Sequence, residues 1–488
     1  MYQFILLFAI STLVRVAVGL NPFSGYGNTN PPPGQAPHGD FECHRTWLTV
    51  ATHFPIEQWY TNTTLSNVSY WPMDYPPLCM QMHYMLGRSV EVLQPEAFET
   101  QGYKEPRYVW IMRLWVILLE YAVFVPAAVY FLRVTQGEVT PFHLMVITLI
   151  PATIFVDNSH FQFNQVMHGF VLWAIGFILD GKLSRATIFM VLAINFKQMA
   201  LYFSLPFGVY ALAILMERHR RDYIKVGGSI LWLLVVFVAT NLLIWSPFLW
   251  AGGQQTANDI LYRIFPVRRG IFEGKVATFW CFLHHCGIKL FKVNFWDRQV
   301  QLRVTTAVTL VSCVPTLWCL WAKPSRKNFL VSQLSVCMAF FLFSMQVHEK
   351  QILSPLLIYT LCVTNNIKAS WLYRVNLLCT TSLFCLIRGD AADPVFLSLQ
   401  IGTMAAGWGH ITTLEVVWTV LVLKATSDWM EKDLIVIIGN FVHFVCFSLF
   451  FLEATARQCL EVFLPQWAPE KDSFVARLFI DDFKPKEE

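Results

Sequence analysis

Long apolar runs, separated by short polar segments, occupy most of this 488-residue chain. A helix needs roughly 20 apolar residues to cross a bilayer, so the shorter runs are expected to be tilted or broken helices. The pattern predicts an all-α polytopic membrane protein, a single integral membrane domain over residues 1–488 with about fourteen transmembrane helices. The predicted spans are 2–20, 107–132, 140–156, 161–180, 183–196, 199–216, 224–249, 302–322, 328–347, 351–366, 370–388, 393–408, 412–426 and 432–453.

Composition supports this interpretation and narrows the classes of partner. Hydrophobic residues make up 55% of the chain and charged residues only 14%, whereas an average soluble protein carries roughly 25% charged residues. The basic residues form short clusters beside the apolar runs and no continuous stripe, which argues against nucleic-acid binding. Most of the 12 cysteines lie in apolar runs, where cysteine is a small core residue.

The basic clusters predict the orientation of the chain, because cytosolic loops carry an excess of Lys and Arg. All the strongly basic clusters fall on the same side of the membrane if residues 251–300 form a long loop that does not cross it. The loops 21–106 and 251–300 are then lumenal, and the tail 454–488 is cytosolic. The clusters are 217–221, 323–327, and Lys182 with Arg185.

Three features of the chain ends and the first loop indicate in which cellular membrane the protein lies. The first run has no preceding positive charge and no Ala-x-Ala site, so it is expected to be a retained anchor. Asn62 and Asn67 head the two N-glycosylation sequons, and both lie in the first loop. The chain ends in a Lys-x-Lys-x-x arrangement at 484–488, either an ordinary charged tail or a retrieval signal, which a cytosolic tail favours. These features predict a multi-pass protein of the endoplasmic-reticulum membrane.

The first loop is expected to contain structure of its own. Residues 21–39 are rich in Gly, Pro and Asn and are expected to be irregular. The segments 41–54 and 77–92 mix aromatic and polar positions and are predicted to be interfacial helices. Cys43 and Cys79 either form a disulfide, if the loop is lumenal, or remain small packed residues.

Polar residues gather at the predicted lumenal ends of the apolar runs, where charge is costly unless it is paired or hydrated. One such cluster alone is most often an interfacial anchor, but five on one face favour a functional site. Their mixture suits a phosphorylated sugar, because cations can hold a phosphate, amides can bind hydroxyl groups, and Tyr and Trp faces can stack on sugar rings. The clusters are 40–45, 157–164, 195–198, 263–275 and 348–350.

Several cofactor signatures are missing from the sequence. No Asp-x-Asp pair lies on the predicted lumenal face, which argues against a metal-held nucleotide sugar. The Gly-x-x-x-x-Gly-Lys loop of ATP-hydrolysing proteins is absent, and no His/Cys spacing resembles a zinc site. We therefore expect neither a metal nor a cofactor.

Several blocks, taken in order, resemble one enzyme family. The blocks are Gly39-Asp40-Phe41-Glu42 with His44-Arg45 and Trp47, Met73-Asp74-Tyr75-Pro76-Pro77, Asp157 with His160-Phe161-Gln162-Phe163-Asn164, Asn195-Phe196-Lys197-Gln198, Arg269-Gly270-Ile271-Phe272-Glu273 with Phe279-Trp280-Cys281, and Val347-His348-Glu349-Lys350. The chain resembles the dolichyl-phosphate-glucose-dependent α-1,3-glucosyltransferases of the endoplasmic reticulum, which have the GT-C membrane fold. The blocks end near residue 353, and the last third is similar mainly in hydrophobicity.

The resemblance implies an enzyme that moves glucose from dolichyl-phosphate-glucose to a lipid-linked oligosaccharide, with both substrates held among membrane lipids. The acidic block and the block ending at Cys281 are similar to the branch that adds the first glucose to lipid-linked Man9GlcNAc2. The paralogue that adds the second glucose and a mannosyltransferase remain alternatives. Cys43, Thr46 and Asn158-Ser159 depart from the common pattern and bear on the acceptor, not on the reaction type.

The resemblance also implies roles for single residues. Asp40 matches the catalytic base, while Glu42 is either an alternative base or a support for His44 or Arg45. A β-linked donor and an α-linked product require inversion, with one carboxylate removing the proton of the mannose 3-hydroxyl. Phosphate is a good leaving group and needs no protonation. The second carboxylic acid, which protonates the leaving group in glycosidases, is therefore replaced by cations that stabilise the phosphate. Lys197, Arg269, His348 and Lys350 are candidates for that phosphate or form structural salt bridges, and His160, Gln162 and Trp280 are further donor-binding candidates.

Two other classes of protein compete with an enzyme. A transporter or flippase for lipid-linked sugars needs polar groups along a path through the membrane and on both faces. Here the polar groups lie on one face, apart from Arg15, Arg113 and Glu120 within apolar runs. A structural or receptor protein has no need to gather acid, base and phosphate-binding groups. The sequence therefore favours chemistry at the membrane surface.

Overall fold

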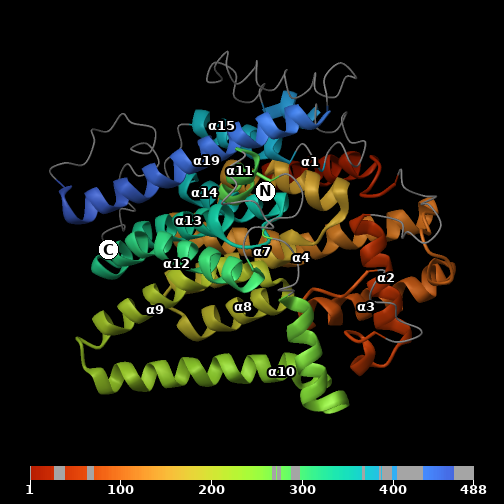
Figure 1. The fold of residues 1–488 in the computed structure, drawn as a ribbon, viewed down its shortest axis with the longest axis horizontal. Helices are drawn as coiled ribbons and strands as arrows, with labels where there is room; N and C mark the ends of the chain where they lie inside the picture. The colour runs from red at the N-terminus through yellow and green to blue at the C-terminus, as the bar shows by residue number, and fades with distance from the viewer. Residues whose placement is uncertain are drawn as a thin grey trace.

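The computed structural model describes residues 2–26, 39–62, 71–265, 271, 276–286, 297–364, 369–383, 386, 398–403 and 432–465. Every element assigned in these ranges is a helix, as the apolar pattern predicts. Most of the long helices run side by side in roughly one direction, and the helices of the first loop lie beyond one end of them (Figure 1). The protein is an all-α membrane protein.

Six helices of the described part are long and apolar enough to cross a bilayer. A seventh is added if α5 (Pro141–Thr148) and the segment Pro151–Phe161, which meet at 50°, form one broken span. The six are α1 (Tyr2–Gly19), α4 (Pro106–Gln136), η4 (Gln198–Phe203) with α9 (Ser204–Arg218), α10 (Tyr223–Ile264), α12 (Arg298–Ala322) and the part Ile437–Phe463 of α19 (Lys432–Phe463).

The expected number of about fourteen spans is not confirmed. Other helices begin and end near predicted spans but are shorter than the roughly 20 residues of a full crossing. They are α7 (Asn164–Leu179), α8 (Leu183–Phe196), α13 (Arg326–Phe343), α14 (Leu353–Val363) and α15 (Ala369–Ser382). The predicted span 412–426 and most of 393–408 lie outside the described residues.

Two glycines allow α7 to pack closely against α4. A Cβ atom at Gly169 would lie 2.9 Å from the Cα of Phe124, and one at Gly176 would lie 2.8 Å from the ring of Tyr130. Helices in membranes associate through such small residues, because close backbone approach replaces the hydrophobic effect as the driving force. This contact matters for function because the polar segment 157–164 leads directly into α7.

The first loop contains the two predicted helices at nearly the predicted positions. They are α2 (Asp40–His53) and α3 (Pro77–Leu93), against expected ranges of 41–54 and 77–92. A Cβ at Gly87 would lie 3.2 Å from the carbonyl oxygen of Leu48, so the two helices pack closely. Figure 1 shows both at the end of the bundle, next to the ends of α4 and α8.

The long helix α10 changes direction where the sequence predicts that the second long loop begins. Gly253 has φ 59° and ψ −144°, which are not helical angles. Residues 254–264 then run across the end of the bundle and do not continue along its axis (Figure 1). The start of the loop 251–300 therefore does not extend the membrane-spanning part of α10.

The charges of Arg15, Glu120 and Arg113 within the apolar runs are buried and contact other parts of the scaffold. Arg15 and Glu120 form a buried ion pair whose side chains are 0% and 1% exposed. Arg15 also donates to the carbonyl oxygen of Thr148 at 2.7 Å, so it joins α1, α4 and α5. Arg113 donates to the carbonyl oxygens of Asn21 and Asn158 and thus holds the segment that carries His160. These cations therefore brace the scaffold beneath the polar end of the bundle.

Candidate active site

Asp40 is the first residue of α2, and a constrained turn sets its position. Gly39 has φ 114°, and a Cβ there would lie 2.1 Å from the carbonyl oxygen of Ser24. The N–H of Asp40 donates to the hydroxyl of Ser24 at 3.1 Å, and the N–H of Ser24 donates to the carbonyl of His160 at 3.1 Å. The chain after α1 therefore joins Asp40 to the segment of His160, at a place that glycine alone fits.

His160 and Gln162 lie at the end of an unusual helix. The π-helix η3 (Phe155–Phe161) ends at Phe161, whose φ is 82°. The carboxylate of Asp157 accepts hydrogen bonds from the N–H of Asn164 at 3.1 Å and from that of Gln165 at 2.7 Å. Asp157 thus stabilises the start of α7 while the π-helix turns the next polar side chains toward α2. Irregular helical turns of this kind occur frequently at functional sites.

Three side chains from two distant segments meet one carboxylate oxygen of Asp40. His160 Nε2 lies 2.9 Å from Asp40 Oδ2, and Gln162 Nε2 and Lys350 Nζ donate to the same oxygen. Lys350 comes from the short helix η6 (Glu349–Ile352), and its Nζ lies 3.2 Å from His160 Nε2. The structure therefore brings four of the sequence-predicted residues into direct contact.

Lys197 stands behind this group and holds it in place. Its ammonium donates to Gln162 Oε1 at 3.2 Å and to Asn164 Oδ1 at 2.6 Å. The hydroxyl of Tyr75 also donates to Gln162 Oε1, at 3.0 Å, and the Lys197 ammonium lies 4.7 Å from the centre of the Tyr75 ring. With its oxygen occupied in this way, the amide of Gln162 can only present its NH₂ to Asp40.

The electrostatic environment keeps Asp40 ionised. Burial raises the pKa of this carboxyl, but the positive charge of Lys350 and the contact with His160 outweigh it and hold the pKa well below its usual range. Burial, together with the charge of Lys350, lowers the pKa of Lys197 to about 8. The cluster therefore combines a carboxylate with two cations at the end of a membrane bundle.

The other residues of the acidic motif make their hydrogen bonds with partners other than Asp40. Arg45 donates to both carboxylate oxygens of Glu42, at 2.8 and 2.6 Å, and to the carbonyl of Ala97 at 3.0 Å. His44 lies flat against His83, with Nδ1 and Nε2 2.8 Å apart. Burial lowers the pKa of His83 to about 4. Glu42, Arg45 and His44 thus connect α2 to η2 (Pro95–Phe98) and α3.

Some predicted residues lie elsewhere or beyond the described part. Trp280 is buried, and its indole N–H donates to the carbonyl of Phe343 at 2.7 Å, so its ring is no exposed platform for a sugar. The backbone N–H of His348, two residues before Lys350, donates to Gln351 Oε1 at 3.2 Å. Asn62 is exposed. Arg269 and Asn67 fall outside the described residues.

Cys43 and Cys79 are both free thiols. The Sγ of Cys79 lies 3.7 Å from Nδ1 of His83, within the packed contact between α2 and α3. Of the two alternatives for these cysteines, the structure has the small packed residue.

Ser24, Tyr75 and Arg113 contribute to the site although the sequence did not place them there. Tyr75 belongs to the Met73–Pro77 block, so its position in a shared motif was an available signal. Arg113 was visible as a cation within an apolar run. Nothing in the sequence singles out Ser24, because its role depends on the backbone of Gly39 approaching it closely.

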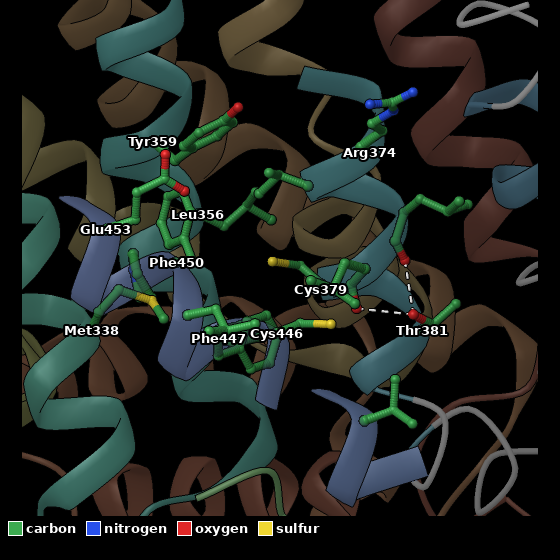
Figure 2. Close-up of a pocket in the computed structure, with 17 residues that line it drawn as sticks. Met338, Leu356, Tyr359, Arg374, Cys379, Thr381, Cys446, Phe447, Phe450 and Glu453 are labelled. Atoms are coloured by element: carbon green, nitrogen blue, oxygen red, sulfur yellow. Dashed lines mark hydrogen bonds between the residues drawn. The ribbon is translucent and has the colours of Figure 1, made fainter. Parts of the chain in front are cut away.

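A separate cavity of about 640 Å³ lies between α13, α14, α15 and α19. Its lining is mostly apolar, and Figure 2 shows Arg374, Tyr359 and Glu453 toward one end of it. Among the described residues that line it, none is a sequence-predicted site residue. An apolar wall cannot stabilise a phosphate or sugar hydroxyls, so the Asp40 cluster is the better candidate for chemistry.

The arrangement around Asp40 can remove a proton from a hydroxyl group and stabilise a neighbouring anion. A carboxylate close to the open end of the site can act as a general base. Two lysines beside it can neutralise charge that develops on a leaving group. Within the described ranges, no three or more His, Cys, Asp or Glu side chains are placed to hold a metal ion.

Comparison with known proteins places this site in context. A model of the ALG6, ALG8 glycosyltransferase family matches residues 11–480. A Dictyostelium discoideum protein named probable dolichyl pyrophosphate Man9GlcNAc2 alpha-1,3-glucosyltransferase is 32% identical over 417 residues, covering 83% of this chain and 77% of the relative. A Gallus gallus protein named dolichyl pyrophosphate Man9GlcNAc2 alpha-1,3-glucosyltransferase is 34% identical over 81% of this chain and 76% of its own length. A similarly named Schizosaccharomyces pombe protein is 32% identical, with coverages of 86% and 81%.

Replacing Gly39 by alanine is expected to displace Asp40 and abolish glycosyl transfer. The added Cβ meets the backbone of Ser24, which cannot rotate away as a flexible side chain could. We expect a loss of roughly a hundredfold, the order seen when a catalytic group moves by about 1 Å. The measurement is transfer activity in isolated membranes, normalised to the amount of protein.

Gly137→Ala is the matched control for this variant. Gly137 also has a positive φ, of 78°, but nothing lies within 4 Å of its added Cβ. It should cost roughly 1–2 kcal/mol of backbone strain and leave transfer intact. Wild-type activity in Gly39→Ala would show that the turn does not position the base.

Proposed function

The chain belongs to the ALG6, ALG8 glycosyltransferase family, and on that premise we propose that it is an α-1,3-glucosyltransferase. Its donor is dolichyl-phosphate-glucose, and its acceptor is the terminal α-1,2-mannose of lipid-linked Man9GlcNAc2. The observation that carries this proposal is the contact of Asp40 with His160, Gln162 and Lys350 at the end of the membrane bundle. The names of the relatives and the sequence blocks support the substrate class.

The reaction is a single inverting displacement. Asp40 takes the proton of the mannose 3-hydroxyl as that oxygen attacks the anomeric carbon of glucose. The new carbon–oxygen bond forms as the bond from the anomeric carbon to the phosphate oxygen breaks, and the electron pair leaves with dolichyl phosphate. The β-linked donor thereby gives an α-linked product. Glu42 is assigned no part, because Arg45 binds both of its carboxylate oxygens and its side chain is only 6% exposed.

Cations take the place of a second acid catalyst. The departing dolichyl phosphate gains negative charge, which Lys350 on η6 and His348 just before η6 stabilise. Lys197 acts from behind through Gln162, and Arg269, which lies outside the described residues, stays a further candidate from the sequence. Charge-assisted contacts of this kind are strongest where water is largely excluded, as at this partly buried cluster.

The site is proposed to face the lumen of the endoplasmic reticulum, with the C-terminus in the cytosol. The positive clusters 217–221 and 323–327 occupy the ends of α9 and the turn between α12 and α13. Figure 1 shows these ends across the bundle from α2 and α3. The rule that positive loops stay in the cytosol therefore supports a lumenal Asp40.

A lipid-linked-sugar transporter is the rival class, and the mid-span charges weigh against it. A transport path needs polar groups available near the middle of the membrane. Arg15 and Glu120 satisfy one another in a buried pair that also binds the backbone at Thr148. The groups that suit a sugar phosphate lie at one end of the bundle, where surface chemistry takes place.

The purified protein is expected to glucosylate lipid-linked Man9GlcNAc2 once. The acidic block and the block ending at Cys281 resemble the first-glucose branch, so an acceptor that already carries one glucose should be a poor substrate. The measurement is mass spectrometry of the oligosaccharide released after incubation of each acceptor with dolichyl-phosphate-glucose. Preference for the monoglucosylated acceptor would reassign the chain to the second-glucose paralogue.

Asp40→Asn is expected to abolish transfer while the protein still inserts and accumulates. The amide keeps the shape of the carboxylate but cannot accept the proton, a role worth roughly 10²–10⁴-fold in rate. The assay uses membranes supplied with both lipid-linked substrates. Asp180→Asn is the control, because Asp180 pairs with Lys182 in the turn between α7 and α8. Turnover within tenfold of wild type would remove Asp40 from the role of base.

Removal of divalent metal is expected to leave the rate unchanged. The donor carries a single phosphate whose charge the side-chain cations neutralise, so no metal is needed to hold a diphosphate. Activity is measured before and after treatment with EDTA in the same membranes. A loss of activity that Mn²⁺ restores would contradict the proposed cation site.

A further inference from the structure

The two carboxylate oxygens of Asp40 differ in their hydrogen bonds. Oδ2 accepts from His160, Gln162 and Lys350, whereas none of the hydrogen bonds of Asp40 to described residues uses Oδ1. The side chain is 24% exposed, so the carboxylate is not sealed off. A carboxylate oxygen offers about two lone-pair sites, and three donors saturate it. Oδ1 is therefore the atom that can receive a proton from a substrate.

The three donors to Oδ2 differ in their freedom to move. Gln162 is held through its own oxygen by Tyr75 and Lys197. His160 is buried on the π-helix, whose backbone is bound by Arg113 and Ser24. The Lys350 side chain is 16% exposed and extends on a flexible four-carbon stem from a four-residue helix. Lys350 can therefore leave Asp40 while the other two donors stay.

The position of Lys350 affects the strength of Asp40 as a base. An ammonium in contact with a carboxylate favours its charged form and so weakens it as a proton acceptor. Withdrawing that cation makes Asp40 a stronger proton acceptor. Bringing an anion close to Asp40 has the same effect. Several other ionisable groups act electrostatically on the same site. They are His44 and Cys43 on α2, Tyr75 and Asp74 before α3, Lys197 after α8, and Glu349 on η6.

We propose that Lys350 is shared between Asp40 and the phosphate of the polyprenyl-phosphate sugar. In the empty enzyme it holds Asp40. When the lipid phosphate binds, Lys350 moves from Asp40 to the phosphate. Asp40 then keeps its hydrogen bonds with His160 and Gln162, and its Oδ1 is open to the acceptor hydroxyl. This inference rests on the proposed function and adds an order of events to it. The donor binds first, and Asp40 becomes an effective base only in the complex with the donor.

The competition has a consequence that can be measured without turnover. If Asp40 and the lipid phosphate compete for one cation, removing the carboxylate must strengthen phosphate binding. Asp40→Asn is therefore expected to bind dolichyl phosphate roughly tenfold more tightly than wild type, the order of coupling for a close charge pair. Lys350→Gln is expected to bind it more weakly by a similar factor. A merely structural ion pair predicts no gain in Asp40→Asn.

The double variant Asp40→Asn/Lys350→Gln separates competition from simple repulsion between the carboxylate and the phosphate. If Lys350 is shared, the double variant binds dolichyl phosphate no more tightly than Lys350→Gln, because the released cation is gone. If the gain persists in the double variant, repulsion alone explains it and the proposal is overturned. Affinities are measured on the full-length protein in lipid nanodiscs, with dolichol as the control that lacks phosphate.

The outcomes also distinguish this proposal from the proposed function. Failure of the wild-type protein to bind dolichyl phosphate above dolichol contradicts the donor class itself. Binding without a gain in Asp40→Asn contradicts only the sharing of Lys350. Thermal unfolding midpoints check that each variant is folded. The absence of a gain in Asp40→Asn overturns the proposal whether or not Lys350→Gln folds.

Discussion

The contact between Asp40 and Lys350 joins residues that are 310 positions apart in the chain, and the candidate site depends on it. Asp40 belongs to the first loop, Lys350 to the turn before α14, and His160 and Gln162 to the segment before α7. Closing so long a loop costs conformational entropy that a local contact cannot offset. The packing of the membrane bundle must therefore contribute the free energy that holds the base and its partners together.

The scaffold beneath the site explains how this precision is reached. Gly169 and Gly176 let α7 approach α4, and Arg113 on α4 then reaches the backbone that carries His160. Arg15 and Glu120 join α1 to the same helix α4. Since breaking a buried ion pair leaves one charge unpaired, these contacts define a single arrangement of α1, α4 and the π-helix. The chain that follows α1 then places Ser24 against the turn before Asp40.

The sequence predicts much of this organisation, but it does not predict which side chains contact one another. The mixture of aromatic and polar positions placed α2 and α3 to within about one residue. The clustering of polar residues at the ends of apolar runs marked the segments 40–45, 157–164, 195–198 and 348–350, and the resemblance implied roles for Asp40, His160, Gln162, Lys197 and Lys350 within them. The i,i+3 spacing of Glu42 and Arg45 permits their ion pair, yet α2 had first to be helical. The stacking of His44 on His83 depends on the packing of two helices, which no local pattern specifies.

Lys197 and Lys350 have the same side chain and different tasks. Lys197 is buried against the amide oxygens of Gln162 and Asn164, and it polarises Gln162 from a fixed position. Lys350 is partly exposed and touches the carboxylate. In the proposed reaction, Asp40 loses its negative charge to the incoming proton, while the phosphate gains negative charge as it departs. In the proposed order of events, Lys350 has already left Asp40 for the bound phosphate, so it stabilises the leaving group at the moment when the proton reaches Asp40. A cation on a flexible stem can make this change of partner, whereas the buried Lys197 cannot.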